Sequence, residues 1–406
     1  MKRLHLRYCC RRLSRVILLA GIVSFSVPAH GLYRGDEMTL RDFSVGSLYF
    51  INRATYLPLI EHEDRFRTAT NALLGAAGSL GSDDLYLFQR LDVQYSPNQH
   101  ITLNADYLRD RDFDGNYQRF TMGLEWHMTP AWSLQLLGSP TPNKEDALIG
   151  TELRYRHGRI DTTAGLHFPL FNFEKNPDDA TLNRQPINVQ WQGRFRLGAR
   201  WEIYGQTDVD FPSRMTNPEQ GFDFEFEKYQ AAAGLRFNIS TQTHVRIETA
   251  YENSTQERAG RSPDDELDFT LDREFAAAHI EFYHVRPDRS FVRMGGHFVY
   301  FNEDNDFPND AEETLLLDRQ DRILYAGRSF ALRDGLQLSA VTLVNFLSDR
   351  RESEDDRVAR DRDIFIVRAA GSIIFYGPRY VFECGAAVRL DRTRFGGGFV
   401  RVFMDF

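Results

Sequence analysis

The feature that most constrains the fold of this chain is an alternation of apolar and polar side chains that recurs along most of its length. In residues 119–126 (RFTMGLEW), apolar side chains occupy every second position, and charged, polar or glycine residues lie between them. Residues 187–197 (INVQWQGRFRL) follow the same rule, with Gly193 as the exception. A period of two indicates β-strands with one apolar face. From Leu85 onward these runs are about ten residues long, the length that a tilted transmembrane strand needs.

The connections between these runs alternate in length. The short ones, most of which contain the turn residues Pro or Gly, centre on 96–100, 129–131, 157–159, 198–200, 240–243, 286–290, 333–335 and 376–379. Longer polar connections lie near 110–116, 139–147, 171–186, 211–224, 254–272, 302–320, 348–362 and 391–396. Short turns at one end and long loops at the other are the pattern of a transmembrane barrel.

Parity sets the number of strands. Eight short and eight long connections give about seventeen strands from Leu85 on, and closing the barrel with both ends on one side needs one more before it. Arg65–Ala76 is our candidate for that strand, with Gly78–Asp84 as its loop, and Phe43–Asn52 is the competitor. We predict an all-β, transmembrane, antiparallel up-and-down barrel over 65–406 with about 18 strands. The alternative is 16, if one hairpin has been split in two.

The first residues read as a secretory signal peptide rather than as structure. Residues 1–29 combine a basic stretch, an apolar run from Val16 to Val27 and a small-residue cleavage site after Ala29. The apolar run is too short for a membrane-spanning helix. Residues 30–64 do not resemble a barrel hairpin, and we expect them to be a periplasmic lead-in or a plug segment. The mature chain then holds one cysteine, Cys384, which excludes an intramolecular disulfide.

Strands with one apolar and one charged face occur in two kinds of fold. In a soluble sandwich the charged face meets water, whereas in a membrane barrel it lines the interior. The signal peptide favours the barrel, as do aromatic residues near the strand ends, such as Trp132, Trp201 and Tyr380. The charged face also favours it, because Lys occurs only at positions 2, 144, 175 and 228 and the cations are otherwise Arg. Arg suits enclosed ion-pair networks.

The last stretch, Gly396–Phe406 (GGGFVRVFMDF), alternates in the same way and ends on an aromatic. It resembles the closing strand of Gram-negative outer-membrane β-barrel proteins, a porin-like class. The resemblance implies residence in the outer membrane, contacts with its lipid and lipopolysaccharide, and insertion by the barrel-assembly machinery with Phe406 as the assembly signal. It is a resemblance to a class and points to no particular family.

Charged residues on the inward face of such a barrel are the candidate functional residues. An Arg-rich wall around a water-filled pore favours anionic or sugar-like solutes. We predict a channel for diffusion or export of polar or anionic solutes such as oligosaccharide or exopolysaccharide. The alternative is a non-transporting barrel for structure, adhesion or surface assembly, with a plugged lumen. The predicted pore-lining residues are Arg119, Glu125, Arg154, Arg156, Arg194, Arg196, Glu202, Asp208, Arg236, Arg246, Glu248, Arg293, Arg328, Arg368 and Arg401.

The sequence does not favour other chemistry. The histidines are scattered and none is paired with a nucleophile in a recognisable catalytic pattern. Phosphate-binding loops, zinc-ligand spacings and basic stripes with aromatics are absent from the sequence. We therefore expect no enzymatic activity, no cofactor, no metal and no nucleic-acid partner.

Overall fold

The structure is a computed structural model, and the part that it describes is almost entirely β-strand. It describes residues 71–80, 84–111, 116–139, 147–171, 181–184, 186–217, 222–260, 268–306, 315–353, 360–391 and 393–406. The predicted signal peptide, the 30–64 segment and the competitor strand 43–52 lie outside these residues. Among the described residues, no helix is long and apolar enough to cross a membrane.

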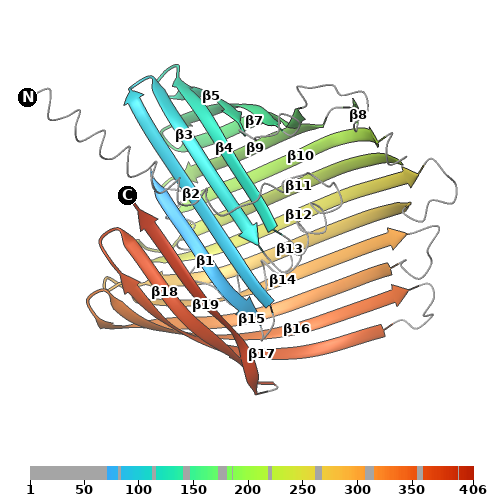
Figure 1. Cartoon of the computed structure of the whole chain (residues 1–406). Helices are drawn as coiled ribbons and strands as arrows, with labels where there is room; N and C mark the ends of the chain where they lie inside the picture. The colour runs from blue at the N-terminus through green and yellow to red at the C-terminus, as the bar shows by residue number, and fades with distance from the viewer. Residues whose placement is uncertain are drawn as a thin grey trace, which may run out of the picture. The chain divides into compact units, whose positions relative to one another are not determined.

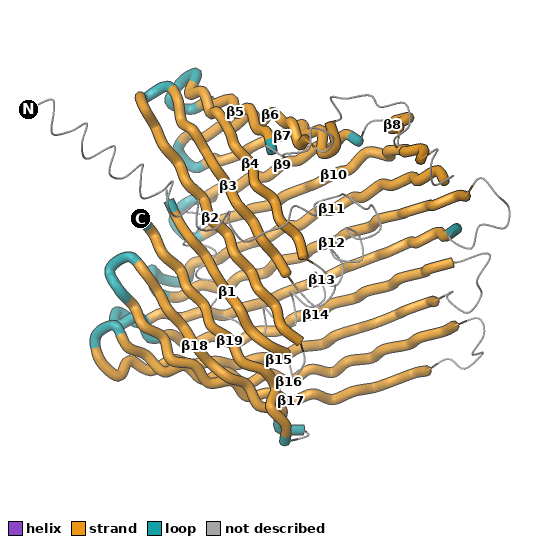
Figure 2. Tube along the Cα trace, viewed as in Figure 1, coloured by secondary structure: helices purple, strands orange, loops and turns teal. Residues whose placement is uncertain are grey.

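Nineteen strand segments make up this part of the chain (Figures 1 and 2). They are β1 (Ala72–Leu80), β2 (Asp84–Asn98), β3 (Ile101–Arg111), β4 (Asn116–His127), β5 (Trp132–Gly138), β6 (Ala147–His157), β7 (Ile160–Phe171), β8 (Thr181–Arg184), β9 (Ile187–Leu197), β10 (Trp201–Asn217), β11 (Phe222–Asn238), β12 (Thr243–Gly260), β13 (Phe269–Val285), β14 (Phe291–Asp306), β15 (Leu315–Arg333), β16 (Leu336–Ser353), β17 (Arg360–Tyr376), β18 (Tyr380–Arg389) and β19 (Arg394–Asp405).

The strands form a closed barrel. Apart from β8, segments that follow one another along the chain pair antiparallel, and β1 pairs with both β2 and β19, which closes the sheet on itself. The segments β8 and β9 pair with different parts of the same strand, β10, so they occupy one position in the wall. Nineteen segments therefore make 18 strands. The predicted closed antiparallel barrel with about 18 strands is confirmed, and the alternative of 16 was wrong.

The strand before Leu85 was predicted in the right place but with the wrong limits. The described strand runs from Ala72 to Leu80, through residues that we had assigned to the following loop. Its sequence, ALLGAAGSL, is made of small residues and shows little alternation, so the pattern could not mark its ends. Pairing with two neighbours fixes them instead, from Ala72 opposite Asp405 to Ser79 opposite Gly398.

Several predicted loops are also partly strand. The β12–β13 ladder continues to Arg258 opposite Phe269, inside the predicted loop 254–272. Likewise, β14 extends to Asp306, inside the predicted loop 302–320. Polar residues on both faces hid these extensions, because alternation marks a strand only where one of its faces is apolar.

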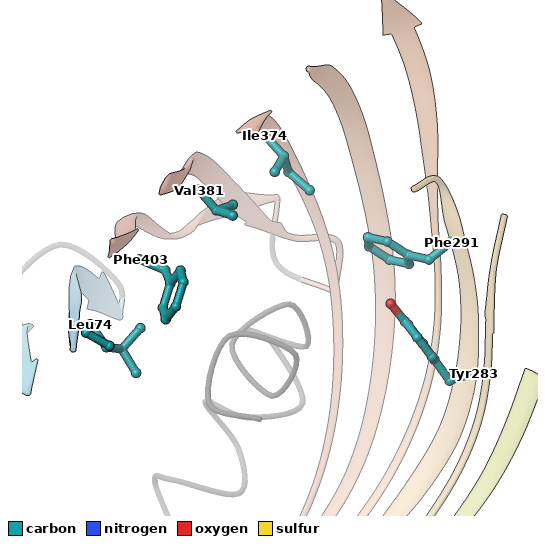
Figure 3. Packing of buried hydrophobic residues seen from close by; sticks show 7 residues of the cluster. Leu74, Tyr283, Phe291, Ile374, Val381 and Phe403 are labelled. Carbon is teal, nitrogen blue, oxygen red and sulfur yellow. The ribbon is translucent and has the colours of Figure 1, made fainter. Parts of the chain in front are cut away.

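The two faces of the wall differ in chemistry. Large apolar side chains are exposed on one face, for example Leu136 at 55% and Leu324 at 61% relative exposure. On the other face, Leu74 of β1, Phe291 of β14 and Ile374 of β17 belong to one buried cluster although these strands do not pair with one another. Figure 3 shows these side chains at separate places around the wall, turned toward the space that the strands enclose, so this is the inner face.

Candidate functional site: an arginine belt on the inner wall

The strand register brings seven arginines into one band of the inner wall. Neighbouring strands lie about 4.8 Å apart, so side chains that follow one another along a row of register partners are in reach of each other. The row passes from Arg156 to Asp161 and Arg194, and from Arg196 to Glu202, Arg236, Arg246 and Glu281. We call this band the arginine belt. It consists of Arg154, Arg156, Arg194, Arg196, Arg236, Arg246 and Arg293, with the carboxylates Asp161, Glu202, Glu248 and Glu281.

On β6 to β10, each carboxylate of the belt is shared by two arginines. Asp161 lies 3.3 Å from Arg154 Nε and 3.0 Å from Arg156 Nε. Glu202 lies 3.7 Å from the Nε atom of Arg194 and 3.3 Å from that of Arg196. One carboxylate cannot neutralise two guanidinium groups, so each of these sites keeps a positive charge.

These four arginines are open to the interior of the barrel. Their side chains have relative exposures of 37% for Arg154, 63% for Arg156, 38% for Arg194 and 60% for Arg196. We call them the open arginines. The shared carboxylates hold one side of each guanidinium group, and the exposed surface faces the space inside the wall. Such an array can accept an anion without first breaking a buried contact.

On β12 to β14 the belt is buried and its groups hold one another. Glu281 accepts a hydrogen bond from Arg246 Nη2 at 3.2 Å, lies 3.9 Å from Arg293 Nε, and accepts one from the Tyr325 hydroxyl at 3.1 Å. The side chains of Arg246 and Glu281 are exposed by only 7% and 2%. This half of the belt is a structural network, because its buried charges are paired with one another inside the wall.

A histidine extends this buried network. His279 Nδ1 hydrogen-bonds to Glu248 at 3.0 Å, and its Nε2 lies 2.9 Å from the Tyr325 hydroxyl. Its ring stacks on that of His297, with centroids 4.1 Å apart. Glu248 also accepts a hydrogen bond from Tyr204 at 2.6 Å. Among the described residues, no group of three or more His, Cys, Asp or Glu side chains is arranged to hold a metal ion.

A hollow lined by amides lies next to the open arginines, toward the long-loop end of the strands. Its lining includes Glu152, Thr163, Gln190, Gln192, Gln206, Asp208 and Gln230. Gln190 donates a hydrogen bond to Asp208 at 3.1 Å. Amide side chains both donate and accept, so a wall of this kind can bind the hydroxyl groups of a solute.

All but one of the predicted pore-lining residues occupy inner-face positions in the strand register. That they line a path for solute remains a prediction. Outside the belt, Glu125 accepts a hydrogen bond from Ser133 at 2.5 Å. Arg401 contacts Glu383 at 3.1 Å, and Arg368 lies opposite Leu343 on the inner face. Only the backbone of Arg119 is described, and its register partner is Leu108.

The placement of Arg328 was wrong. On β15 the residues Ile323 and Tyr325 are buried on the inner face, and Arg328 lies on the opposite face with the exposed Leu324. Its guanidinium group sits over the Phe330 ring, 4.5 Å from the centroid. Arg328 is close to the turn at the end of β15, so its long side chain can reach the polar edge of a membrane.

Tyr325 lies on the inner face for the same reason, and it was not among the predicted pore-lining residues. The segment of β15 around it reads polar and apolar on both faces, so charge alone suggested the wrong face. Tyr204 shares the polar face of its strand with Glu202 and Asp208, but it was not among the predicted pore-lining residues. The available signal was spacing, since Tyr204 lies two residues from Glu202 and therefore shares its face.

Comparisons with known proteins identify no family. No protein-family model and no curated protein matches the chain. Among solved structures it is similar to OccK5 of Pseudomonas aeruginosa, with 10% identity, 82% of this chain and 96% of that chain covered, and a TM-score of 0.43. It is also similar to a bacterial polysaccharide outer membrane secretin, with 11% identity, 83% of this chain and 99% of that chain covered, and a TM-score of 0.40. A third similar structure is OmpT of Vibrio cholerae, with 10% identity, 82% of this chain and 95% of that chain covered, and a TM-score of 0.40.

Proposed function

We propose that this protein is an outer-membrane channel that conducts polar solutes and prefers anions. The observation that carries the proposal is the set of open arginines. On β6 to β10, four guanidinium groups are exposed on the inner wall and share only two carboxylates, Asp161 and Glu202. Fixed charge of one sign along a pore sets its ion selectivity. A low-dielectric wall strengthens the effect, because it focuses the field into the passage.

Residence in a membrane is supported by the outer face. Large apolar side chains are exposed around the wall, and aromatic pairs lie beside the short turns. The rings of Trp132 and Tyr155 are 4.7 Å apart, and those of Trp201 and Phe237 are 4.3 Å apart. Aromatic residues at this level match the interfacial girdle of membrane barrels.

The solute class follows from what the inner wall offers. The planar guanidinium group forms paired hydrogen bonds with carboxylate, phosphate or sulfate. The amide-lined hollow beside the open arginines supplies donors and acceptors for hydroxyl groups. A solute that carries both an acidic group and several hydroxyls uses both surfaces, and an acidic oligosaccharide meets this description. Diffusion and export both fit such a passage.

The test is ion selectivity in planar bilayers. We expect the wild-type channel to pass anions better than cations across a salt gradient. The double variant Arg194→Ala/Arg196→Ala should lose most of this preference, which appears as a shift of the reversal potential toward zero. The matched control is Arg328→Ala, which removes an arginine from the outer face and should leave the reversal potential unchanged.

Two results would contradict the proposal. A wild-type protein that inserts but shows no conductance would leave the non-transporting barrel as the better hypothesis. Equal reversal potentials for the wild type and the double variant would show that the open arginines do not govern permeation.

A further inference from the structure

Three neighbouring short turns carry a group of exposed arginines that lies outside the arginine belt. The turns 286–290, 333–335 and 376–379 follow β13, β15 and β17, and together they contain four arginines and two aspartates. All four arginines are exposed, and in the part of the chain that the structure describes none of them forms a salt bridge. We call this group the arginine patch. It consists of Arg286, Arg289, Arg333 and Arg379.

The three turns contact one another, so the arginine patch is continuous. The amide of Tyr376 donates a hydrogen bond to the carbonyl of Gly335 at 2.8 Å, which joins the second turn to the third. The side chain of Gln337, just after the second turn, donates one to the carbonyl of Asp288 in the first turn at 3.1 Å. The guanidinium group of Arg289 lies over the ring of Tyr376, with its Cζ atom 5.5 Å from the centroid. The positive charge of three hairpins is therefore concentrated on one surface.

Arg289 has a backbone conformation that disfavours a long side chain. Its φ is +64°, and among the described residues other than glycine only Thr393 also has a positive φ. Glycine or asparagine is the usual residue in this region, and an arginine there is strained. The turn is closed by a hydrogen bond from the amide of Arg289 to the carbonyl of Arg286 at 2.9 Å. A guanidinium group at a strained position indicates a role for the side chain beyond the turn itself.

The arginine patch borders the apolar outer face of the barrel. Phe330, three residues before Arg333, is 47% exposed, and Tyr380, directly after Arg379, is 45% exposed. Phe375 lies on the same outer face, and its ring centroid is 6.0 Å from that of Phe382. Aromatic residues at this level mark the boundary between the acyl chains and the head groups of a membrane. The guanidinium groups next to them are therefore at the level of the lipid head groups.

The outer face of the same strands has the opposite charge at its other end. Toward the long loops of β13 to β16, the outward side chains that the structure describes include more carboxylates than arginines, namely Asp272, Glu274, Asp304, Asp306 and Asp318 against Arg322 and Arg350. A negatively charged head group is therefore attracted at the short-turn end and repelled at the long-loop end.

We infer that the arginine patch binds anionic phospholipids in the membrane leaflet at the short-turn end. Guanidinium groups bind phosphate through paired hydrogen bonds, and each basic side chain at the membrane surface adds to the attraction. A soluble phosphate contacts the arginines alone, whereas a phospholipid also covers the exposed rings of Phe330 and Tyr380 with its acyl chains. The inference rests on the membrane residence in the proposed function, and it is independent of conduction.

Native mass spectrometry of the full-length protein, released from a non-ionic detergent, tests the inference. Phosphatidylglycerol and phosphatidylcholine of equal chain length are added in equal amounts, and the ratio of the two bound lipids is measured. We expect the wild type to bind phosphatidylglycerol at least about tenfold better, and Arg333→Gln/Arg379→Gln to lower this preference at least about fivefold. The matched control Arg214→Gln/Arg322→Gln removes two exposed arginines of the outer face nearer the long loops and should leave the preference unchanged.

A soluble competitor and a single variant sharpen the test. Glycerol phosphate in large molar excess should leave phosphatidylglycerol bound, because it has the head-group phosphate but no acyl chains. Arg289→Asn should lower the lipid preference without lowering the thermal unfolding midpoint, since asparagine tolerates a positive φ. This variant also replaces the double variant if the latter does not fold.

Three results would overturn the inference. The first is a wild type that binds the two lipids equally. The second is a preference that survives in the double variant, because the lipid would then be held elsewhere on the barrel. The third is displacement of phosphatidylglycerol by glycerol phosphate, which would mean that the patch takes soluble phosphates. The readout is lipid binding rather than current, so its failure is distinguishable from failure of the proposed channel.

Discussion

The carboxylate of Glu383 on β18 and the guanidinium group of Arg401 on β19 lie 3.1 Å apart, and both side chains are almost wholly buried, at 0% and 1% relative exposure. The Ser372 hydroxyl donates a hydrogen bond to the other oxygen of Glu383 at 2.6 Å. The guanidinium group of Arg401 also lies over the ring of Phe399, with the Cζ atom 4.3 Å from the ring centroid. This ion pair therefore joins the last two strands from the inside of the barrel, next to the seam where β19 meets β1.

Removing one partner of this pair should destabilise the barrel. We expect Glu383→Ala to lower the free energy of unfolding by roughly 3–5 kcal/mol, because it leaves the buried charge of Arg401 without its carboxylate. The double variant Glu383→Leu/Arg401→Met should recover most of that loss, since it removes both charges together. Urea unfolding in lipid vesicles, followed by tryptophan fluorescence, measures both values. A single variant as stable as wild type would mean that the pair does not stabilise the contact between β18 and β19.

The turn between β15 and β16 should tolerate no side chain at Gly335. Its φ is +74°, and an added Cβ would lie 2.8 Å from the carbonyl oxygen of Tyr376. We expect Gly335→Ala to cost about 1–3 kcal/mol of unfolding free energy. Gly371→Ala is the control, because the nearest atom to its added Cβ is 3.9 Å away. The prediction fails if the two substitutions have the same effect in the same unfolding assay.

The hydroxyl group of Tyr325 should contribute to stability. Tyr325→Phe removes the hydrogen bond to Glu281 at 3.1 Å and the contact with His279 at 2.9 Å, both inside the wall. Leaving buried polar groups without a partner costs about 1–3 kcal/mol. Tyr380→Phe serves as a control, because Tyr380 is 45% exposed. Thermal unfolding midpoints of the two variants compare them directly, and equal midpoints would argue against a structural role for this network.

The turn between β13 and β14 contains a carboxyl group that should respond to acid. Asp288 accepts hydrogen bonds from the Ser290 hydroxyl at 2.6 Å and from the Ser290 amide at 2.9 Å. These bonds hold the pKa of Asp288 below its usual value, with the hydroxyl as the larger cause. A depressed pKa in the folded state stabilises the turn above the usual Asp range and loses that contribution as the pH falls through the folded pKa.

Ser290→Ala should therefore raise the pKa of Asp288 toward the value of about 3.9 found in model peptides. The rise should be partial, because the amide of residue 290 still donates its bond. Carboxyl-carbon NMR titration of the variant and the wild type measures it. Asp391, in a different loop, is the internal reference. Its pKa is lowered by a hydrogen bond from Arg389, and this pKa should be the same in the variant and the wild type. An unchanged Asp288 pKa would mean that the hydroxyl does not contribute.

The hairpin order was predictable because its signals are local. The turns at 198–200 and 333–335 contain Gly198 and Gly335, both of which adopt positive φ, and they fall where the sequence placed them. Strand ends were harder to predict. At the long-loop end of β12 and β14 the ladder continues through residues that are polar on both faces, and no sequence period marks where backbone pairing stops.

The inner face was predictable wherever one face is cleanly apolar. On β9, the alternation of Trp191 with Gln190 and Gln192 gives the correct assignment. On β15 the alternation gives the wrong assignment, because the charged Arg328 lies on the outer face and the aromatic Tyr325 lies on the inner face. Pairing decides the matter there, since Tyr325 lies opposite Gly295 of β14, in register with the buried inner row.

The sequence by itself determined that this chain is an antiparallel barrel of about eighteen strands, because side-chain period, turn residues and parity are all local or countable. Only the tertiary structure decided which charges meet. Arg154 and Arg293 belong to one belt, and Leu74 and Phe291 to one buried cluster, although each pair is far apart in the chain. Such neighbours are set by the register of many strands and by closure of the sheet, and a shift of one residue in pairing exchanges the two faces of a strand.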